Sequence, residues 1–191
     1  DQARQVFVSA READRMIYYH DRLVTITNEL PREINTIGLN DLLRPLFLYA
    51  SVNSAGGADP IAENRAVFIV LSAYLTELDL ATLIGDDVEL AIPRVVDVVI
   101  DRREDLARHV VTSAAISASA GAGMAEVLSV YKEVHDSRYR TGFSFTDIAA
   151  NQAGSRLGDL ASRSEADAFL FQDLMKAILN ESEFMPSLGT Y

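Results

Sequence analysis

The stretch DPIAENRAVFIVLSAYL, residues 59–75, decides the fold. Asp59 can accept hydrogen bonds as the N-cap of a helix, and Pro60 suits the first helical position, where a missing N–H costs no helical bond. The ten residues that follow Arg65 are apolar on nearly every side of a helix. The sequence therefore predicts a helix from 60 to about 83, buried at the centre of the protein.

Apolar residues at helical spacing continue on both sides of this central segment. Further helices are expected at 2–29, 39–49, 103–119, 123–137, 145–161 and 165–179. Pro45 is expected to interrupt the second of these helices, because proline lacks the N–H that a helix interior uses. β-branched residues predict one short strand or extended segment near 92–100.

The predicted fold class is therefore mainly α. We expect a single-domain helical bundle of six or seven helices, with at most one short β element near 92–100. The domain is predicted to span residues 1–180, and the aperiodic segment 181–191 is expected to be a flexible C-terminal tail.

Composition excludes some classes of function. The chain has 191 residues, 28 acidic and 17 basic side chains, and a formal net charge of -11. Without a basic stripe, such a chain would repel phosphate backbones, so nucleic acid is not expected as a partner. There is no cysteine, which leaves oxygen and imidazole as the ligands for any metal. No cofactor is evident, although a divalent metal could bind.

Two features bear on the cellular location. The longest apolar run, residues 66–75, is about half of a transmembrane helix, so the chain as given is expected to be soluble. The sequence begins at Asp1 rather than Met. We therefore expect a processed chain or an artificially trimmed one, and a removed signal peptide is compatible with either.

The most polar stretch is YKEVHDSRYRTGFSFTDIAANQAG, residues 131–154. It contains two predicted helices joined by a short turn, which favours antiparallel neighbours. Glu133 and Asp136 share one helix face, and Asp147 and Asn151 share a face of the next helix. Their polar faces are expected to confront each other.

The preceding helix adds His109 and Ser113, which are four residues apart in an increasingly apolar segment. A buried histidine there needs a hydrogen-bonding partner. The predicted binding cluster consists of His109, Ser113, Lys132, Glu133, Asp136, Ser144, Asp147 and Asn151. The candidate catalytic residues are Glu133, Asp136 and His109, and the candidate metal ligands are His109, Glu133, Asp136 and Asp147.

A purely structural interpretation of this cluster is also available, and the spacing favours it. Lys132 and Asp136 would form an ordinary helix-surface ion pair, and Asp147 would cap its own helix. The pattern lacks the specificity of a metalloprotease HExxH motif or a calcium-binding loop. Small residues in SAAISASAGAG (113–123), together with Ala150, Gly154 and Gly158, would permit close packing of neighbouring helices.

Three blocks of residues, in order, resemble the YfiM-like envelope lipoproteins of bacteria. They are the His-x-x-x-Ser pattern that starts at His109, the block YKEVHD at 131–136, and GFSFTDIAANQAG at 142–154. The last block is also similar to the Asp-x-x-x-Asn-x-x-Gly helix of VanZ-like membrane proteins. The resemblance covers about residues 105–158 and implies one polar cluster, but no established reaction.

The resemblance also implies a location and a class of partner. It implies an exported, lipoprotein-like protein of the cell envelope, which lies in the periplasm or is anchored to the outer membrane in its full-length precursor. Membrane-proximal or envelope proteins would then be its partners.

Three hypotheses of function follow. The first is a structural or binding protein of the envelope, in which the polar cluster holds helices in register. The second is a metal-dependent or acid/base hydrolase that acts on envelope material. The third is a small-ligand binding module with a pocket among the helices rich in small residues. The first is favoured, because an all-helical chain without a recognised catalytic motif is more often a scaffold or a binder.

Overall fold

The computed structural model describes residues 8–85, 88–120, 145–178 and 180–185. Its centre is α3, Pro60–Thr76, which is buried along most of its length. Asp59 caps it, because its Oδ1 accepts hydrogen bonds from the backbone N–H groups of Ile61 and Ala62 at 3.0 and 3.3 Å. The predicted central buried helix is confirmed.

The end of this helix differs from the prediction of about 83. Glu77 adopts a left-handed conformation with φ 54° and ends α3 at Thr76. A separate short helix, α4 (Ala81–Ile84), follows. Asp79 starts it by accepting a hydrogen bond from the N–H of Ala81 at 3.0 Å. The apolar pattern continues through both helices, so it did not reveal the turn between them.

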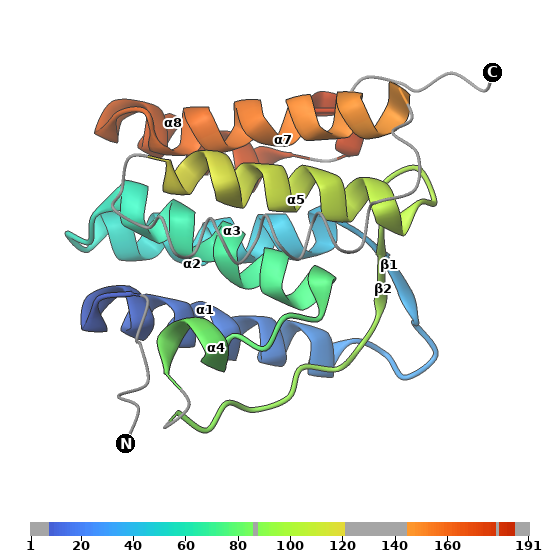
Figure 1. The fold of residues 1–191 in the computed structure, drawn as a ribbon, viewed down its shortest axis with the longest axis horizontal. Coiled ribbons are helices and arrows are strands. Elements are labelled where there is room, and N and C mark those ends of the chain that lie inside the picture. The colour runs from blue at the N-terminus through green and yellow to red at the C-terminus, as the bar shows by residue number, and fades with distance from the viewer. Residues whose placement is uncertain (1–7, 86–87, 121–144, 179, 186–191) are drawn as a thin grey trace.

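The other helices surround α3. They are α1 (Ala10–Glu29), α2 (Asn40–Ala55), α5 (Glu104–Ser119), α7 (Phe145–Ser162) and α8 (Glu165–Ala177). All five contact α3. In Figure 1, α5 and α7 lie side by side on one side of α3, and α1 lies on the other side. Together with α3 and α4 they make seven α-helices in the described residues, which confirms the mainly α fold class.

The predicted interruption at Pro45 is wrong. α2 runs through this residue without a break. Its inward face, which includes Leu42, Leu46 and Phe47, is fully buried. Packing of this face outweighs the single backbone hydrogen bond that proline removes.

A two-stranded parallel sheet closes one end of the bundle (Figure 1). β2 (Asp97–Val99) lies inside the segment expected to be extended, and it pairs with β1 (Thr36–Gly38), with Ile37 opposite Val98. β1 was not predicted. At three residues it is too short to show the alternation of side chains from which a strand is recognised.

Two of the expected segments, 123–137 and 181–191, are described only in part or not at all. The helix expected at 123–137 lies outside the described residues. In the segment expected to be a flexible tail, Glu181–Glu183 form a short 3-10 helix, and the side chain of Met185 is buried in the core. Among the described residues, no helix combines the length and apolar character that a membrane crossing requires.

Two glycines allow α5 and α7 to approach closely. A Cβ atom on Gly154 would lie 2.1 Å from the backbone oxygen of Val110, and one on Gly158 would lie 2.3 Å from that of Ala114. No side chain fits at such distances. The predicted role of these glycines in tight packing therefore holds, and they line a helix contact rather than a pocket.

We expect Gly154→Ala to lower the free energy of unfolding by about 1–3 kcal/mol or more, because the added methyl group forces α5 and α7 apart. Helix propensity alone would raise stability by up to about 1 kcal/mol, so the sign of the change separates the two effects. Urea unfolding measures it. Ser155→Ala, at an exposed position of the same helix, is the control, and a stabilised Gly154→Ala would contradict the close packing.

Candidate functional site

The predicted cluster has its described core between α5 and α7. His109 is 3% exposed, and its Nδ1 lies 2.9 Å from Oδ1 of Asn151. The hydroxyl of Ser113 donates to the same oxygen at 3.0 Å. Because an amide oxygen only accepts hydrogen bonds, Nδ1 is the donor in this contact. Asn151 therefore satisfies two polar groups on the facing helix.

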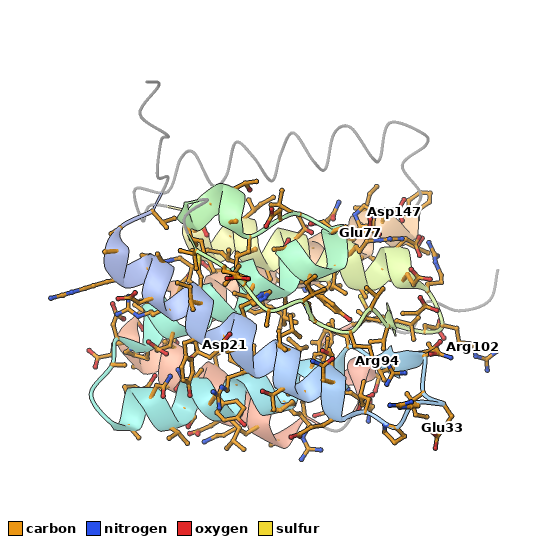
Figure 2. All side chains as sticks on the ribbon, turned by 90° about the horizontal axis from the view of Figure 1, so that it is seen from below. Asp21, Glu33, Glu77, Arg94, Arg102 and Asp147 are labelled. Carbon is orange, nitrogen blue, oxygen red and sulfur yellow. The ribbon has the colours of Figure 1, made fainter. Side chains whose placement is uncertain are left out.

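The other ring nitrogen of His109 faces a carboxylate. Its Nε2 lies 3.8 Å from Oδ1 of Asp147, whose side chain is 14% exposed. Asp147 lies on the first turn of α7, at one end of the molecule (Figure 2). Arg103 approaches the same carboxylate oxygen at 3.7 Å and donates to the hydroxyl of Thr146 at 3.0 Å. Hydrogen bonds from Arg103 also hold the pKa of Asp105 below its usual value.

The structure thus brings together four of the eight predicted cluster residues, His109, Ser113, Asp147 and Asn151. The remaining four, Lys132, Glu133, Asp136 and Ser144, lie outside the described residues. Arg103 and Thr146 also belong to the cluster, although the sequence did not indicate them. In the sequence Arg103 stands directly before Glu104 and Asp105, and only the packing of α5 on α7 brings it to Asp147.

The described part of the cluster suits a cross-link between helices. The imidazole is almost fully buried, and side chains of α7 face both of its nitrogens. A further hydrogen bond joins the two helices about two turns after His109 on α5. There the hydroxyl of Ser117 donates to the backbone oxygen of Ser155 at 2.9 Å. Within the described ranges, no three His, Cys, Asp or Glu side chains are grouped so that they could hold a metal ion.

We expect Asn151→Ala to lower the free energy of unfolding by about 1–3 kcal/mol, because it removes the acceptor shared by His109 and Ser113. Thermal or urea unfolding measures the loss. Gln152→Ala, at the exposed neighbouring position, should change stability by less than about 0.5 kcal/mol. Equal stabilities of the two variants would show that the cluster does not hold α5 against α7.

A second buried polar network, which sequence reasoning missed, joins α1, α2 and α3. The carboxylate of Glu63 is 3% exposed at the residue level and accepts three hydrogen bonds. Tyr19 donates its hydroxyl proton to Oε2 at 2.5 Å. Asn53 donates to the same oxygen at 3.0 Å, and Arg15 donates to Oε1 at 2.9 Å. The signal was the single acid in a central helix that is otherwise mostly apolar.

This network controls the ionisation of Tyr19. Burial raises the pKa of Tyr19 well above its usual value of 10.0, and the hydrogen bond to the Glu63 carboxylate raises it further. The neutral phenol is therefore the form that the folded state requires. Since the unfolded chain ionises at the lower pKa, this contribution to stability is complete below about pH 10 and is lost as the pH rises above it.

We expect Tyr19→Phe to lower the free energy of unfolding at neutral pH by about 1.5–3 kcal/mol, the usual range for a hydrogen bond to a charged group. Above about pH 10 the free energy of unfolding should fall less steeply in the variant than in the wild type. Denaturant unfolding across pH 7 to 11 would show this. Tyr18→Phe, on the same helix but with a half-buried ring, is the control, and equal alkaline slopes for Tyr19→Phe and wild type would contradict the assignment.

A cavity of about 400 Å³ lies beside the C-terminal half of α3. The segment 90–98 forms its opposite wall, and α5 contributes to its edge. Apolar side chains supply most of the lining, among them Val70, Leu75, Leu78, Leu90, Val96 and Val98. The third hypothesis expected a pocket among the helices rich in small residues. The cavity does not lie between those helices, although α5 contributes to its edge.

Most of this wall belongs to the segment 88–96, which has no regular secondary structure, so side chains hold its backbone. Tyr74 on α3 donates its hydroxyl proton to the backbone oxygen of Arg94 at 2.8 Å and accepts from the N–H of Val96 at 3.1 Å. His20 on α1 bonds the backbone oxygen of Ala91 at 2.7 Å through Nε2. These contacts fix the wall against both helices.

Arg94 ties the same wall to the loop that follows α1. Its Nη1 donates to the carbonyls of Leu30 and Pro31, each at 3.0 Å. Its Nη2 donates to the carbonyl of Arg32 at 3.1 Å and to that of Ile34. One guanidinium thus satisfies four backbone acceptors and holds the irregular wall in place. The cavity is therefore preformed.

The chain matches no family model, no curated protein and no solved structure. The resemblance to YfiM-like and VanZ-like proteins accordingly depends on the three quoted sequence blocks alone.

Proposed function

We propose that this chain is a binding protein for a small, largely apolar molecule, which it holds in the cavity beside α3. The cavity itself carries the proposal. Its volume of about 400 Å³ falls within the range of about 300–1,000 Å³ that is typical of ligand sites. Its lining is mainly apolar, with a few polar groups at the edge, which is the usual composition of such sites.

The fixed wall supports the same proposal. An irregular segment left loose would close over an apolar cavity and bury it, because exposed apolar surface is unfavourable in water. The hydrogen bonds of Arg94 and Tyr74 oppose that collapse. A preformed site also binds with a smaller loss of conformational entropy.

In this proposal the cluster formed by His109, Ser113, Asp147 and Asn151 has a structural role. Its hydrogen bonds keep α5 and α7 in register. For the hydrolase alternative, Nε2 of His109 and Oδ1 of Asp147 lie 3.8 Å apart. Its proposed base and remaining metal ligands, Glu133 and Asp136, lie outside the described residues. The binding protein is favoured because the cavity beside α3 lies within the described residues and has the volume and lining of a ligand site.

An extracytoplasmic location remains part of the proposal. It is supported by the resemblance of residues 105–158 to envelope lipoproteins. Partners in or near the envelope belong to the same proposal. Fractionation of cells that carry the native gene would test it, since recovery in the cytoplasmic fraction would contradict it.

We expect the neutral fluorescent probe N-phenyl-1-naphthylamine to bind with a one-to-one stoichiometry and to be displaced by n-octanol. Leu75→Trp should weaken probe binding by about tenfold, equivalent to about 1.4 kcal/mol, because the larger side chain occupies the cavity. Fluorescence titration measures both affinities, and circular dichroism verifies that the variant is folded.

Leu170→Trp is the matched control, since it makes the same substitution at a half-exposed position of α8, away from the cavity lining. It should leave probe binding unchanged. Absence of saturable binding to the wild type, or equal binding by a folded Leu75→Trp variant, would refute the proposed function.

A further inference from the structure

The charged groups at the edge of the cavity are unequally divided. Carboxylates come from four residues, Glu77, Asp79, Asp97 and Glu104, whereas Arg108 is the single guanidinium among the lining residues. The remaining titratable lining groups are His20, which bonds the carbonyl of Ala91, and Tyr74.

The one guanidinium is already opposed by a carboxylate. Nη1 of Arg108 lies 3.9 Å from Oε2 of Glu104, one turn earlier on α5. Within the described residues, no ion pair neutralises Glu77, Asp79 or Asp97. Asp79 uses Oδ1 to accept the N–H of Ala81, which leaves its negative charge in place. The edge of the cavity therefore has an excess of negative charge.

Asp97 brings this charge next to the apolar wall. It lies on β2 directly after Val96, whose N–H bonds the hydroxyl of Tyr74. Burial is the main cause that raises the pKa of Tyr74; the nearby carboxylate of Asp97 adds to the rise, whereas the guanidinium of Arg94 and the hydrogen bond from Val96 oppose it. A ligand whose apolar part contacts Val96 would thus have its polar end beside a carboxylate.

We propose that the cavity selects ligands that combine an apolar body with a positively charged amino or ammonium group, which the carboxylates at its edge attract. This inference rests on the proposed function, since it assumes that the cavity binds a ligand at all. The protein as a whole supports the selection, because its formal net charge of -11 also attracts cations.

A carboxylate ligand is the competing possibility. Nε of Arg108 is buried without a hydrogen-bond partner, and a guanidinium can bind a carboxylate at two points. Glu104 competes for the same guanidinium, however, and the three other carboxylates would repel an anion. The observations therefore favour a cation.

The test compares three ligands of one chain length: n-octylamine, which is protonated at pH 7, n-octanol and n-octanoate. Each is titrated against the full chain by displacement of N-phenyl-1-naphthylamine at low salt. We expect the amine to bind about fivefold more tightly than the alcohol, as one favourable charge interaction near a surface would give, and the carboxylate to bind most weakly. The preference should shrink at about 1 M salt, where the Debye length is about 3 Å.

Two variants separate local from overall charge. Asp97→Asn should reduce the preference for amine over alcohol, because it removes a carboxylate at the cavity edge, while affinity for the alcohol stays unchanged. Asp173→Asn removes the same charge from a 71% exposed side chain on α8, away from the cavity, and should leave the preference as it is.

The outcomes distinguish the two proposals. Equal binding of amine and alcohol would overturn the charge selection and leave the proposed function intact. Tightest binding of octanoate would overturn it in favour of Arg108 as an anion site. An equal loss of preference in both variants would assign the effect to overall charge and refute a site at the cavity edge. Failure of the probe and of all three ligands to bind would refute the proposed function itself.

Discussion

The burial of α3 on all sides is the constraint on which the other helices depend. A helix that is apolar around most of its circumference must be covered on every face, so a single partner helix would not suffice. Five helices provide that cover, with α1 on one side and the α5–α7 pair on the other. The glycines of α7 allow this pair to pack at backbone contact, which makes room for both helices against α3.

The few polar groups on α3 determine how the surrounding helices are placed. Glu63 binds α1 and α2 through Tyr19, Arg15 and Asn53. Asn64 donates to the backbone oxygens of Ala161 and Ala168, at the junction of α7 and α8. Each buried polar group must find a partner, and only one arrangement of the neighbours supplies it. Apolar burial drives association, and these groups select the geometry.

The cavity arises where this cover changes from helix to irregular chain. The segment 88–96 meets α3 without a helical surface that could interdigitate with it, and its backbone needs hydrogen-bonding partners from elsewhere. Arg94, Tyr74 and His20 supply them. The same contacts hold the wall in a fixed position across the cavity from α3, so the stability of an irregular segment and the presence of a cavity have one physical cause.

The sequence by itself determined the central helix, most of the helix positions and the close packing at Gly154, because these depend on local signals such as caps, apolar periodicity and the absence of a side chain. It also indicated that a buried His109 needs a hydrogen-bonding partner. It did not indicate that Glu63 receives three donors from α1 and α2, or that Arg94 bonds carbonyls about sixty residues away. Nor did it indicate the cavity, whose lining comes from α1, α3, the turn after α3, α5, β2 and the loop before β2. Only the tertiary structure decided these features, because each depends on distances between segments that are remote in sequence and leave no periodic or local trace in any one of them.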